Sequence, residues 1–305
     1  MVVTHAHDVA KLKLNKADNV ARPKRVLMVD PEHFRVDYAI NPYMTNAAGE
    51  LNKIDLGLAK KQWATLKATY ERLGFEVLVV TGDHKLPDMV FAANQSFPFL
   101  LFDKSGAPKK TVVLSRMRSE FRRPEVPYFK SFYKDLGYDV AELNAPSKDI
   151  YFEGNGDAIP HYPYNLVWGG YGERTSPEVY HELSERFGLN VAMLKLIDRN
   201  FYHLDTCFSI LNENTVVIQK EAFDSDGLEL IRAVFTNVIE AELEDNLNYF
   251  VCNCHSPDGR HVITHKGAQK FVETLKKHKF DVIEVDTGEY IKSGGSVFCM
   301  KMMVY

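Results

Sequence analysis

Glu71-Arg-Leu-Gly-Phe-Glu-Val-Leu-Val-Val80 has the pattern of a helix end, a turn and an apolar strand. The glycine suits the left-handed conformation that ends many helices, and the alternating side chains after it suit a strand. Before it, Trp63, Leu66 and Tyr70 recur at helical spacing. They predict an amphipathic helix over residues 56–73.

This pattern recurs along the chain. It returns as Lys134-Asp-Leu-Gly-Tyr-Asp-Val-Ala-Glu-Leu143, as Glu185-Arg-Phe-Gly-Leu-Asn-Val-Ala-Met-Leu194 and, with lysine replacing glycine, as Lys276-Lys-His-Lys-Phe-Asp-Val-Ile-Glu-Val285. A degraded copy, Ala233-Val-Phe-Thr-Asn-Val-Ile-Glu-Ala241, precedes the last of these. Further short strands are predicted at residues 111–115, 165–168 and 215–218.

The repeats predict the fold class. Five helix–strand units spaced by roughly fifty residues indicate an α/β repeat architecture that closes on itself. The alternative is an open α/β sheet, in which the pattern recurs because αβ loops favour glycine.

Composition limits the function classes. With 45% hydrophobic and 26% charged residues, the chain has the composition of a soluble globular protein. A net charge of −4 does not favour binding to nucleic acid, and no run approaches the roughly 18 apolar residues of a membrane span. Residues 1–22 are polar and lack the apolar core of a signal peptide. They are predicted to form a flexible tail before one domain, at residues 23–305, of a cytoplasmic protein.

Polar motifs follow the predicted strands at equivalent places in four units. They are Pro87-Asp-Met-Val-Phe-Ala-Ala-Asn94, Phe152-Glu-Gly-Asn-Gly-Asp157, Phe201-Tyr-His-Leu-Asp-Thr-Cys207 and Ser293-Gly-Gly-Ser-Val-Phe-Cys299. If rotation about one axis relates the units, these motifs meet at one end of that axis. We therefore expect them to form a single site.

Cys299 is the candidate nucleophile of this site. It follows Gly294 and Gly295, which let the backbone turn sharply or a ligand approach closely, and it is predicted to lie in a short apolar strand. A thiolate is the best side-chain nucleophile near neutral pH. The alternative is a buried structural cysteine, which is the usual environment of a free thiol.

The remaining cysteines suggest no site of their own. With no export signal apparent, the four cysteines of the chain are predicted to be reduced. Cys252-Asn-Cys254-His255 resembles metal ligands only superficially, because its spacing matches no common zinc pattern. We interpret it as two strand cysteines beside a turn, and no metal is predicted.

Carboxylates accompany the candidate proton carrier, His203. On a strand, His203 and Asp205 would point to the same face. Glu153 and Asp157 bracket a Gly-Asn-Gly loop, and they could orient an imidazole and hold a cation. The alternatives are a histidine hydrogen-bonded in the core and an ordinary turn.

Asp88 and Asn94 lie in an otherwise apolar segment, where they could face a ligand or serve as caps. Arg116, Arg122 and Arg174 are candidates for anchoring a substrate carboxylate, which suits the guanidinium fork. Solvated surface positions are the alternative for each arginine.

Together these motifs resemble those of the guanidino-group-modifying enzymes. That family combines a C-terminal cysteine after glycines, a His-x-Asp and a Glu-containing glycine loop, which match Cys299, His203-Leu-Asp205 and Glu153. The resemblance runs from Arg25 to the C-terminus and is closest to the catalytic domain of cyanobacterial arginine dihydrolases. Other shared segments are Val36-Asp-Tyr-Ala-Ile-Asn-Pro42, Val113-Leu-Ser-Arg116 and Gly170-Tyr-Gly-Glu-Arg174.

The resemblance implies a pentein fold, which is a five-bladed α/β propeller of ββαβ repeats with pseudo-fivefold symmetry, as a single catalytic domain. It implies a small guanidino substrate, no cofactor and a covalent thiouronium intermediate on Cys299, with His203 and Glu153 assisting. The substrate-binding residues would be Asp88, Asn94, Arg116, Arg122, Asp157, Arg174 and Asp205. A homo-oligomer is left open.

Asn94 bears on which guanidino reaction is expected. Arginine deiminases and amidinotransferases carry an aspartate at this place, whereas an asparagine offers both a donor and an acceptor. It could therefore hold a neutral ureido group for a second attack, which favours conversion of arginine through citrulline to ornithine. A deiminase, a dimethylarginine hydrolase, an amidinotransferase and a non-catalytic pentein binding protein are the alternatives.

Overall fold

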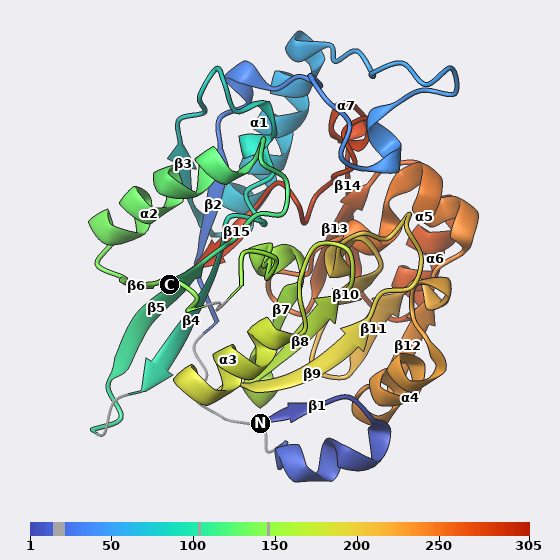
Figure 1. Ribbon diagram of the computed structural model, residues 1–305. Helices are drawn as coiled ribbons and strands as arrows, with labels where there is room; N and C mark the ends of the chain where they lie inside the picture. The colour runs from blue at the N-terminus through green and yellow to red at the C-terminus, as the bar shows by residue number, and fades with distance from the viewer. Residues whose placement is uncertain (15–21, 103–104, 145–146) are drawn as a thin grey trace.

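The strands form five small sheets in the computed structural model, which describes residues 1–14, 22–102, 105–144 and 147–305 (Figure 1). In sheet order, the strands are β15 (Met302–Val304), β2 (Arg25–Val29) and β3 (Glu76–Val80); β4 (Ser96–Phe102), β5 (Pro108–Leu114) and β6 (Asp139–Ala141); β1 (Val2–Val3), β9 (Asn190–Lys195), β8 (Leu166–Tyr171) and β7 (Ala158–His161); β10 (Phe208–Ile210), β11 (Thr215–Ile218) and β12 (Asn237–Glu240); and β13 (His261–His265) and β14 (Asp281–Val285).

The sheets share one internal pattern. In four of them, a central strand pairs antiparallel with one neighbour and parallel with the other, as β5 does with β4 and β6. In the fifth sheet, β13 and β14 pair in parallel. Here the antiparallel pairing is limited to an isolated bridge between His255 and Ile263. Because the strands are divided among five sheets, the alternative of one open sheet is wrong. Strand β15 pairs with β2, so the last unit shares a sheet with the first.

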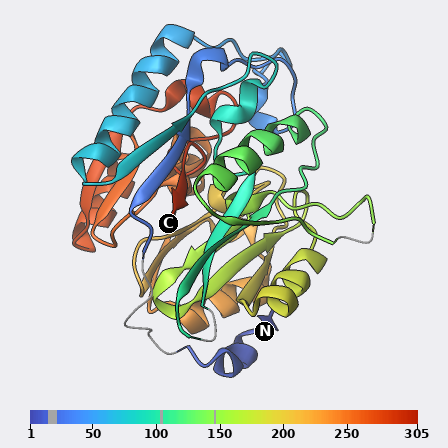
Figure 2. The same ribbon diagram turned by 90° about the vertical axis from the view of Figure 1, so that its left-hand side faces the viewer.

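One helix precedes the parallel partner strand in each unit. These are α1 (Leu56–Arg72), α2 (Val126–Asp135), α3 (Glu178–Phe187), α4 (Ser225–Val234) and α6 (Gln269–Lys277), with α5 (Leu243–Tyr249) and α7 (Gly288–Ile291) as short additions. The five predicted helix–strand units are therefore confirmed. The helices lie on the outside of the molecule, around the sheets (Figures 1 and 2).

Backbone dihedrals explain the glycine of the repeat. Gly74, Gly137 and Gly188 have φ values of 86°, 73° and 70°, in the left-handed region that favours glycine. Lys279 adopts a φ of 65° at the same place in the last unit. In the degraded fourth unit, Phe235 has a φ of −98°, so that helix ends without the left-handed residue.

The core lies between the helices and the sheets. On α1, Leu66 and Tyr70 have no exposed surface, and they pack in one cluster with Val26 and Met28 of β2. Burying one such apolar side chain contributes about 1.5–3 kcal/mol to stability. The predicted apolar face of this helix is therefore the face that docks it on its sheet.

The N-terminal segment differs from the predicted flexible tail. Residues 15–21 lie outside the described residues, but residues 1–14 are ordered: β1 pairs parallel with β9, and a 3₁₀ helix (Ala6–Leu12) contacts α4. Val3 and Leu12 are buried. The expectation is corrected for residues 1–14, because Val3 lies in a strand added to the edge of a sheet and Leu12 packs in a core cluster, which the polar average of the segment conceals.

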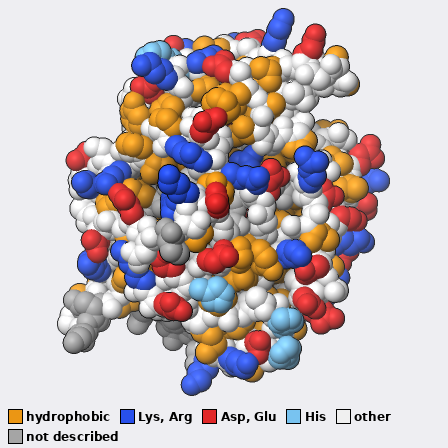
Figure 3. Space-filling view, in the orientation of Figure 1, with side chains coloured by type: hydrophobic (Ala, Val, Ile, Leu, Met, Phe, Trp, Pro, Cys, Tyr) orange, Lys and Arg blue, Asp and Glu red, His pale blue; other side chains and the backbone are white. Residues whose placement is uncertain are grey.

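Acidic and basic side chains are interspersed on the face shown in Figure 3. Within the described part of the chain, the helices are too short or too polar to traverse a bilayer.

Candidate active site

The polar motifs lie in short turns that come after the parallel partner strand of each unit. The 3₁₀ turns Pro87–Val90, Gly154–Gly156, Leu204–Thr206 and Val251–Asn253 come from the first four units, and the turn before β15 comes from the last. A small cavity of about 20 Å³ is lined by Asp88 of the first of these turns, by His203, which precedes the third, and by Cys299 of the last. Six of the predicted site residues line it: Asp88, Asn94, Arg122, Arg174, His203 and Cys299.

Cys299 lies in a turn, not in the predicted strand, which begins only at Met302. Its sulfur is 3.1 Å from Asp205 Oδ2 and 3.1 Å from Asn253 Nδ2. The turn is tight because Gly294 has a φ of 87°, and Gly295 packs so closely on Phe91 that a Cβ atom would clash. The prediction of a strand at Cys299 is therefore wrong, because the two glycines allow the backbone to form a tight turn instead.

Burial and the nearby Asp205 carboxylate raise the pKa of the Cys299 thiol well above its usual value. Burial also raises the pKa of Asp205 to about 7, against the hydrogen bond from Cys299. In the absence of a ligand the sulfur is therefore a neutral thiol at neutral pH. A cation bound in the cavity would favour the thiolate.

His203 pairs with Glu153 and not with Asp205. Its Nε2 lies 2.6 Å from Glu153 Oε2. The predicted strand is absent here: His203 caps the turn Leu204–Thr206, so His203 and Asp205 do not share a face, and Asp205 contacts Cys299 instead. The expected pairing is thus corrected.

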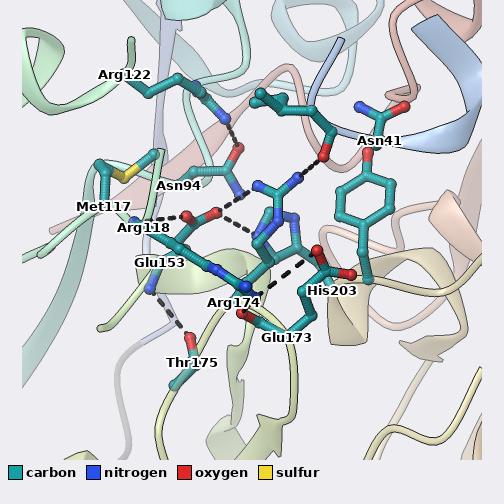
Figure 4. A network of polar contacts seen from close by, with 12 residues as sticks. Asn41, Asn94, Met117, Arg118, Arg122, Glu153, Glu173, Arg174, Thr175 and His203 are labelled. Carbon is teal, nitrogen blue, oxygen red and sulfur yellow. Dashed lines mark hydrogen bonds and ion pairs between the residues drawn. The ribbon is translucent and has the colours of Figure 1, made fainter. Parts of the chain in front are cut away.

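Glu153 is held by several donors (Figure 4). Besides His203, it accepts from Arg174 Nη1 at 3.1 Å and from the backbone N–H of Arg118 at 3.0 Å. Although burial raises it, Arg174 and His203 hold the pKa of Glu153 well below its usual range. The carboxylate is therefore ionised, can only accept, and fixes the orientation of the imidazole.

Asp157 lies behind this pair and does not line the cavity. Its oxygens accept from Thr175 Oγ1 at 2.7 Å and from the backbone N–H of Leu204 at 2.9 Å. Its Oδ2 is 4.0 Å from His203 Nε2, and burial raises its pKa to about 6. Asp157 thus positions the turn that carries His203.

Arg122 fixes the orientation of Asn94. Arg122 Nη1 donates to Asn94 Oδ1 at 2.9 Å, while Nη2 pairs with Glu125 Oε2 at 2.9 Å. Asn94 Nδ2 is buried and has no hydrogen-bond partner among the described residues. Close by, Asp88 Oδ1 accepts from Ser293 Oγ at 3.2 Å. The site thus offers an amide donor and a carboxylate acceptor.

Replacing Arg122 tests this support. Burial raises the pKa of Glu125 to about 7, although Arg122 opposes it. Arg122→Met would leave the buried carboxylate without its charged partner and with only the hydrogen bond from Gln95 Nε2, so we expect it to lower the free energy of unfolding by about 3–5 kcal/mol in urea titrations. Arg72→Met changes an exposed arginine at the end of α1 and should stay within about 0.5 kcal/mol of wild type. Equal losses in the free energy of unfolding in both variants would contradict this stabilising role of Arg122.

The other two candidate arginines are placed differently. Arg174 donates to Glu153 and to the backbone oxygen of Ile40, and its guanidinium lies 4.9 Å from the centre of the Tyr202 ring. Arg116 instead donates to the backbone oxygen of Ser147 at 3.1 Å and lines a separate hollow of about 790 Å³. Arg116 is therefore not brought to the site.

The segment around Cys252 and Cys254 is not a strand. Val251–Asn253 is a 3₁₀ turn, both cysteines are buried in the core, and His255 Nδ1 bonds the hydroxyl of Tyr70 at 2.9 Å. The prediction of a strand here is wrong because, in the fourth unit, this segment forms the turn that carries a polar motif in the other units. The sequence interpretation missed Asn253, which contacts Cys299; its only signal was its place in the degraded repeat.

Comparison with known proteins gives consistent matches. The family described as N,N dimethylarginine dimethylhydrolase, eukaryotic, matches residues 30–305. The N(G),N(G)-dimethylarginine dimethylaminohydrolase of Mycobacterium tuberculosis is 32% identical over 289 residues, covering 95% of this chain and 88% of that protein.

The bifunctional arginine dihydrolase/ornithine cyclodeaminase AgrE of Nostoc sp. is 36% identical over 284 residues. The match covers 92% of this chain, which spans 38% of that longer relative. The crystal structure of the N-terminal domain of ArgZ, a cyanobacterial arginine dihydrolase, superposes with a TM-score of 0.82 at 33% identity, covering 92% of this chain and 97% of that domain. This chain therefore belongs to the N,N dimethylarginine dimethylhydrolase family of guanidino-group-modifying hydrolases.

Proposed function

We propose that the protein is a cysteine-dependent hydrolase that converts arginine to ornithine, ammonia and carbon dioxide, with citrulline as an intermediate. The observation that carries this proposal is the fixed amide of Asn94. Arg122 holds its oxygen, which leaves the buried Nδ2 without a partner among the described residues at the wall of the cavity. An N–H donor at that place suits the oxygen of a neutral ureido group, while the Asp88 carboxylate in the same lining can accept from a guanidinium.

The first cycle removes one nitrogen from the guanidinium. The substrate cation lies beside Asp88, the carboxylate in the cavity lining, and favours the Cys299 thiolate. The sulfur attacks the guanidinium carbon, and His203, oriented by Glu153, gives a proton to the departing ammonia. Water then attacks the resulting thiouronium, His203 takes its proton, and the ureido product is released from the sulfur.

The second cycle attacks the ureido carbon. The Asn94 amide donates to the ureido oxygen and so stabilises the negative charge that develops there. A second ammonia leaves, water releases the N-substituted carbamoyl group from the sulfur as a carbamic acid of ornithine, and this acid decomposes to ornithine and carbon dioxide. A cyanobacterial relative agrees with covalent chemistry, because an asparagine-to-serine variant of ArgZ was crystallised covalently bound to a reaction intermediate.

A wider hollow next to the cavity suits the amino-acid end of the substrate. It has a volume of about 410 Å³ and shares Ile40 and Arg174 with the cavity. Arg118 and Arg123 also line it. We infer that a substrate carboxylate binds among these arginines. We also infer that the five sheets are the blades of a pentein propeller.

Dimethylarginine hydrolysis is the second candidate, and the family match favours it. It would release dimethylamine and stop at citrulline. A deiminase would release one ammonia, and an amidinotransferase would pass the amidino group to an amine. Mass spectrometry of the products therefore separates these reactions.

The decisive experiment changes Asn94 to aspartate. We expect wild type to release two ammonia per arginine and to form ornithine, and Asn94→Asp to accumulate citrulline. The carboxylate offers no donor to the ureido oxygen, and an unpaired buried partner costs about 1–3 kcal/mol, or roughly tenfold to a hundredfold in the second cycle.

Asn246→Asp is the control, because Asn246 is buried but lies outside the cavity lining. It should keep ornithine as the product. One ammonia per arginine and accumulating citrulline in wild type would refute the dihydrolase reaction and leave the guanidino hydrolase intact.

A further inference from the structure

Asn253 occupies the centre of a hydrogen-bond cluster around the sulfur, and its side chain is fully buried. Its amide oxygen accepts from the backbone N–H groups of Ser296, Phe298 and Cys299 at 3.1, 3.1 and 3.2 Å. Its amide nitrogen donates to the backbone oxygen of Asp205 at 2.8 Å and to Cys299 Sγ at 3.1 Å. One side chain thus joins the third, fourth and fifth units at the nucleophile.

We propose that Asn253 is a catalytic residue that holds the turn of the nucleophile and donates a hydrogen bond to the Cys299 thiolate. The proposal rests on the proposed function only in taking Cys299 as the nucleophile.

The backbone of the nucleophile turn requires an acceptor of this kind. Residues 296–300 form neither a regular helix nor a strand, so their buried N–H groups cannot all be satisfied by a ladder. Asn253 Oδ1 accepts from three of these groups at once, and the N–H of Phe298 is shared with the backbone oxygen of Asn253 at 2.9 Å. Since the same side chain reaches the sulfur, the position of the turn and the position of the sulfur are set together.

The donor role follows from the two neighbours of the sulfur. In the neutral state the thiol can donate to Asp205 Oδ2 while it accepts from Asn253 Nδ2. When the proton leaves, Asp205 repels the thiolate, whereas the Asn253 amide attracts it. Burial and Asp205 raise the thiol pKa, and the hydrogen bond from Asn253 lowers it. The amide therefore favours the nucleophilic form.

Asn253→Asp separates the two roles. Aspartate is nearly isosteric and keeps an oxygen for the three N–H groups, but when ionised it offers no donor and places negative charge beside the sulfur. We expect the pH midpoint for alkylation of Cys299 by iodoacetamide, followed by peptide mass spectrometry, to rise by about one unit or more. We also expect kcat on arginine to fall by roughly 100-fold or more.

Asn246→Asp is the matched control. Asn246 is buried and donates to the backbone oxygen of Thr206, and its own oxygen accepts from the backbone N–H of Cys252, so its hydrogen bonds among the described residues do not include the sulfur. Its variant should lower the melting temperature without moving the alkylation profile. A wild-type profile in Asn253→Asp, or equal shifts in both variants, would overturn the proposal.

Asn253→Ala, which removes donor and acceptor together, completes the set. Failure of both Asn253 variants to fold, with Asn246→Asp folded, would assign Asn253 to the fold alone and also overturn the proposal. Alkylation needs no turnover. The role of Asn253 is therefore tested even if the protein leaves every guanidino substrate unchanged, and that result would refute only the proposed function.

Discussion

Cys299→Ser is expected to lose turnover of arginine by roughly 10⁴-fold or more, because a serine hydroxyl beside Asp205 cannot replace a thiolate as the nucleophile. The substitution removes little volume and keeps a group that can hydrogen-bond to Asp205 and Asn253, so the fold should persist. Steady-state ammonia release and a urea unfolding curve measure the two effects. Intact-protein mass spectrometry with arginine should show a covalent adduct in the wild type and none in the variant.

Cys252→Ser and Cys254→Ser serve as controls. Both cysteines are buried in a core cluster and neither lines the cavity, so their serine variants should keep most of the activity at some cost in stability. Comparable activity losses in all three variants would point to an effect on the fold and would refute Cys299 as the nucleophile.

His203→Ala should be the second most damaging substitution, with a loss of about 10³-fold in kcat, the usual contribution of a general acid–base residue. Removal of the imidazole takes away the proton for the departing ammonia and the base for water. Glu153 keeps its hydrogen bonds from Arg174 and Arg118, so its charge stays paired and the structure should tolerate the change. The measurement is kcat, with circular dichroism as the check on folding.

His203→Gln extends this test to the intermediate. We expect a covalent adduct on Cys299 that forms and fails to hydrolyse, visible by mass spectrometry after acid quenching. The matched control is His265→Gln, because His265 bonds Thr287 and does not line the cavity. Normal turnover by the His203 variants would place the proton carrier elsewhere.

The fold followed from local features of the sequence. Side-chain periodicity predicted residues 56–73 as a helix, and α1 spans Leu56–Arg72. Residues 215–218 were predicted as a strand, and β11 spans Thr215–Ile218. Both succeed because helix and strand depend on neighbouring residues along the chain. The polar N-terminal segment could not be predicted in this way, because β1 is ordered by β9, which is distant in sequence.

The members of the site could be grouped from the sequence, but their contacts could not. The repeated motifs pointed to Cys299, His203 and Glu153 together. The pairing of His203 with Asp205, which assumed a strand, is wrong because a 3₁₀ turn does not alternate its side chains as a strand does. The expectation that Glu153 could orient the imidazole agrees with the observed contact. Asn253 went unnoticed in a degraded repeat.

Local patterns in the chain were enough to predict the helix–strand units, the glycines that end three of the helices, and the chemical groups that the motifs carry. The contacts of Glu153 with His203, of Asp205 and Asn253 with Cys299, and of Arg122 with the amide of Asn94 became apparent only from the folded chain. The reason is physical. Secondary structure depends on backbone conformation and spacing within a few residues, whereas these contacts join different units and depend on how the units are rotated against one another.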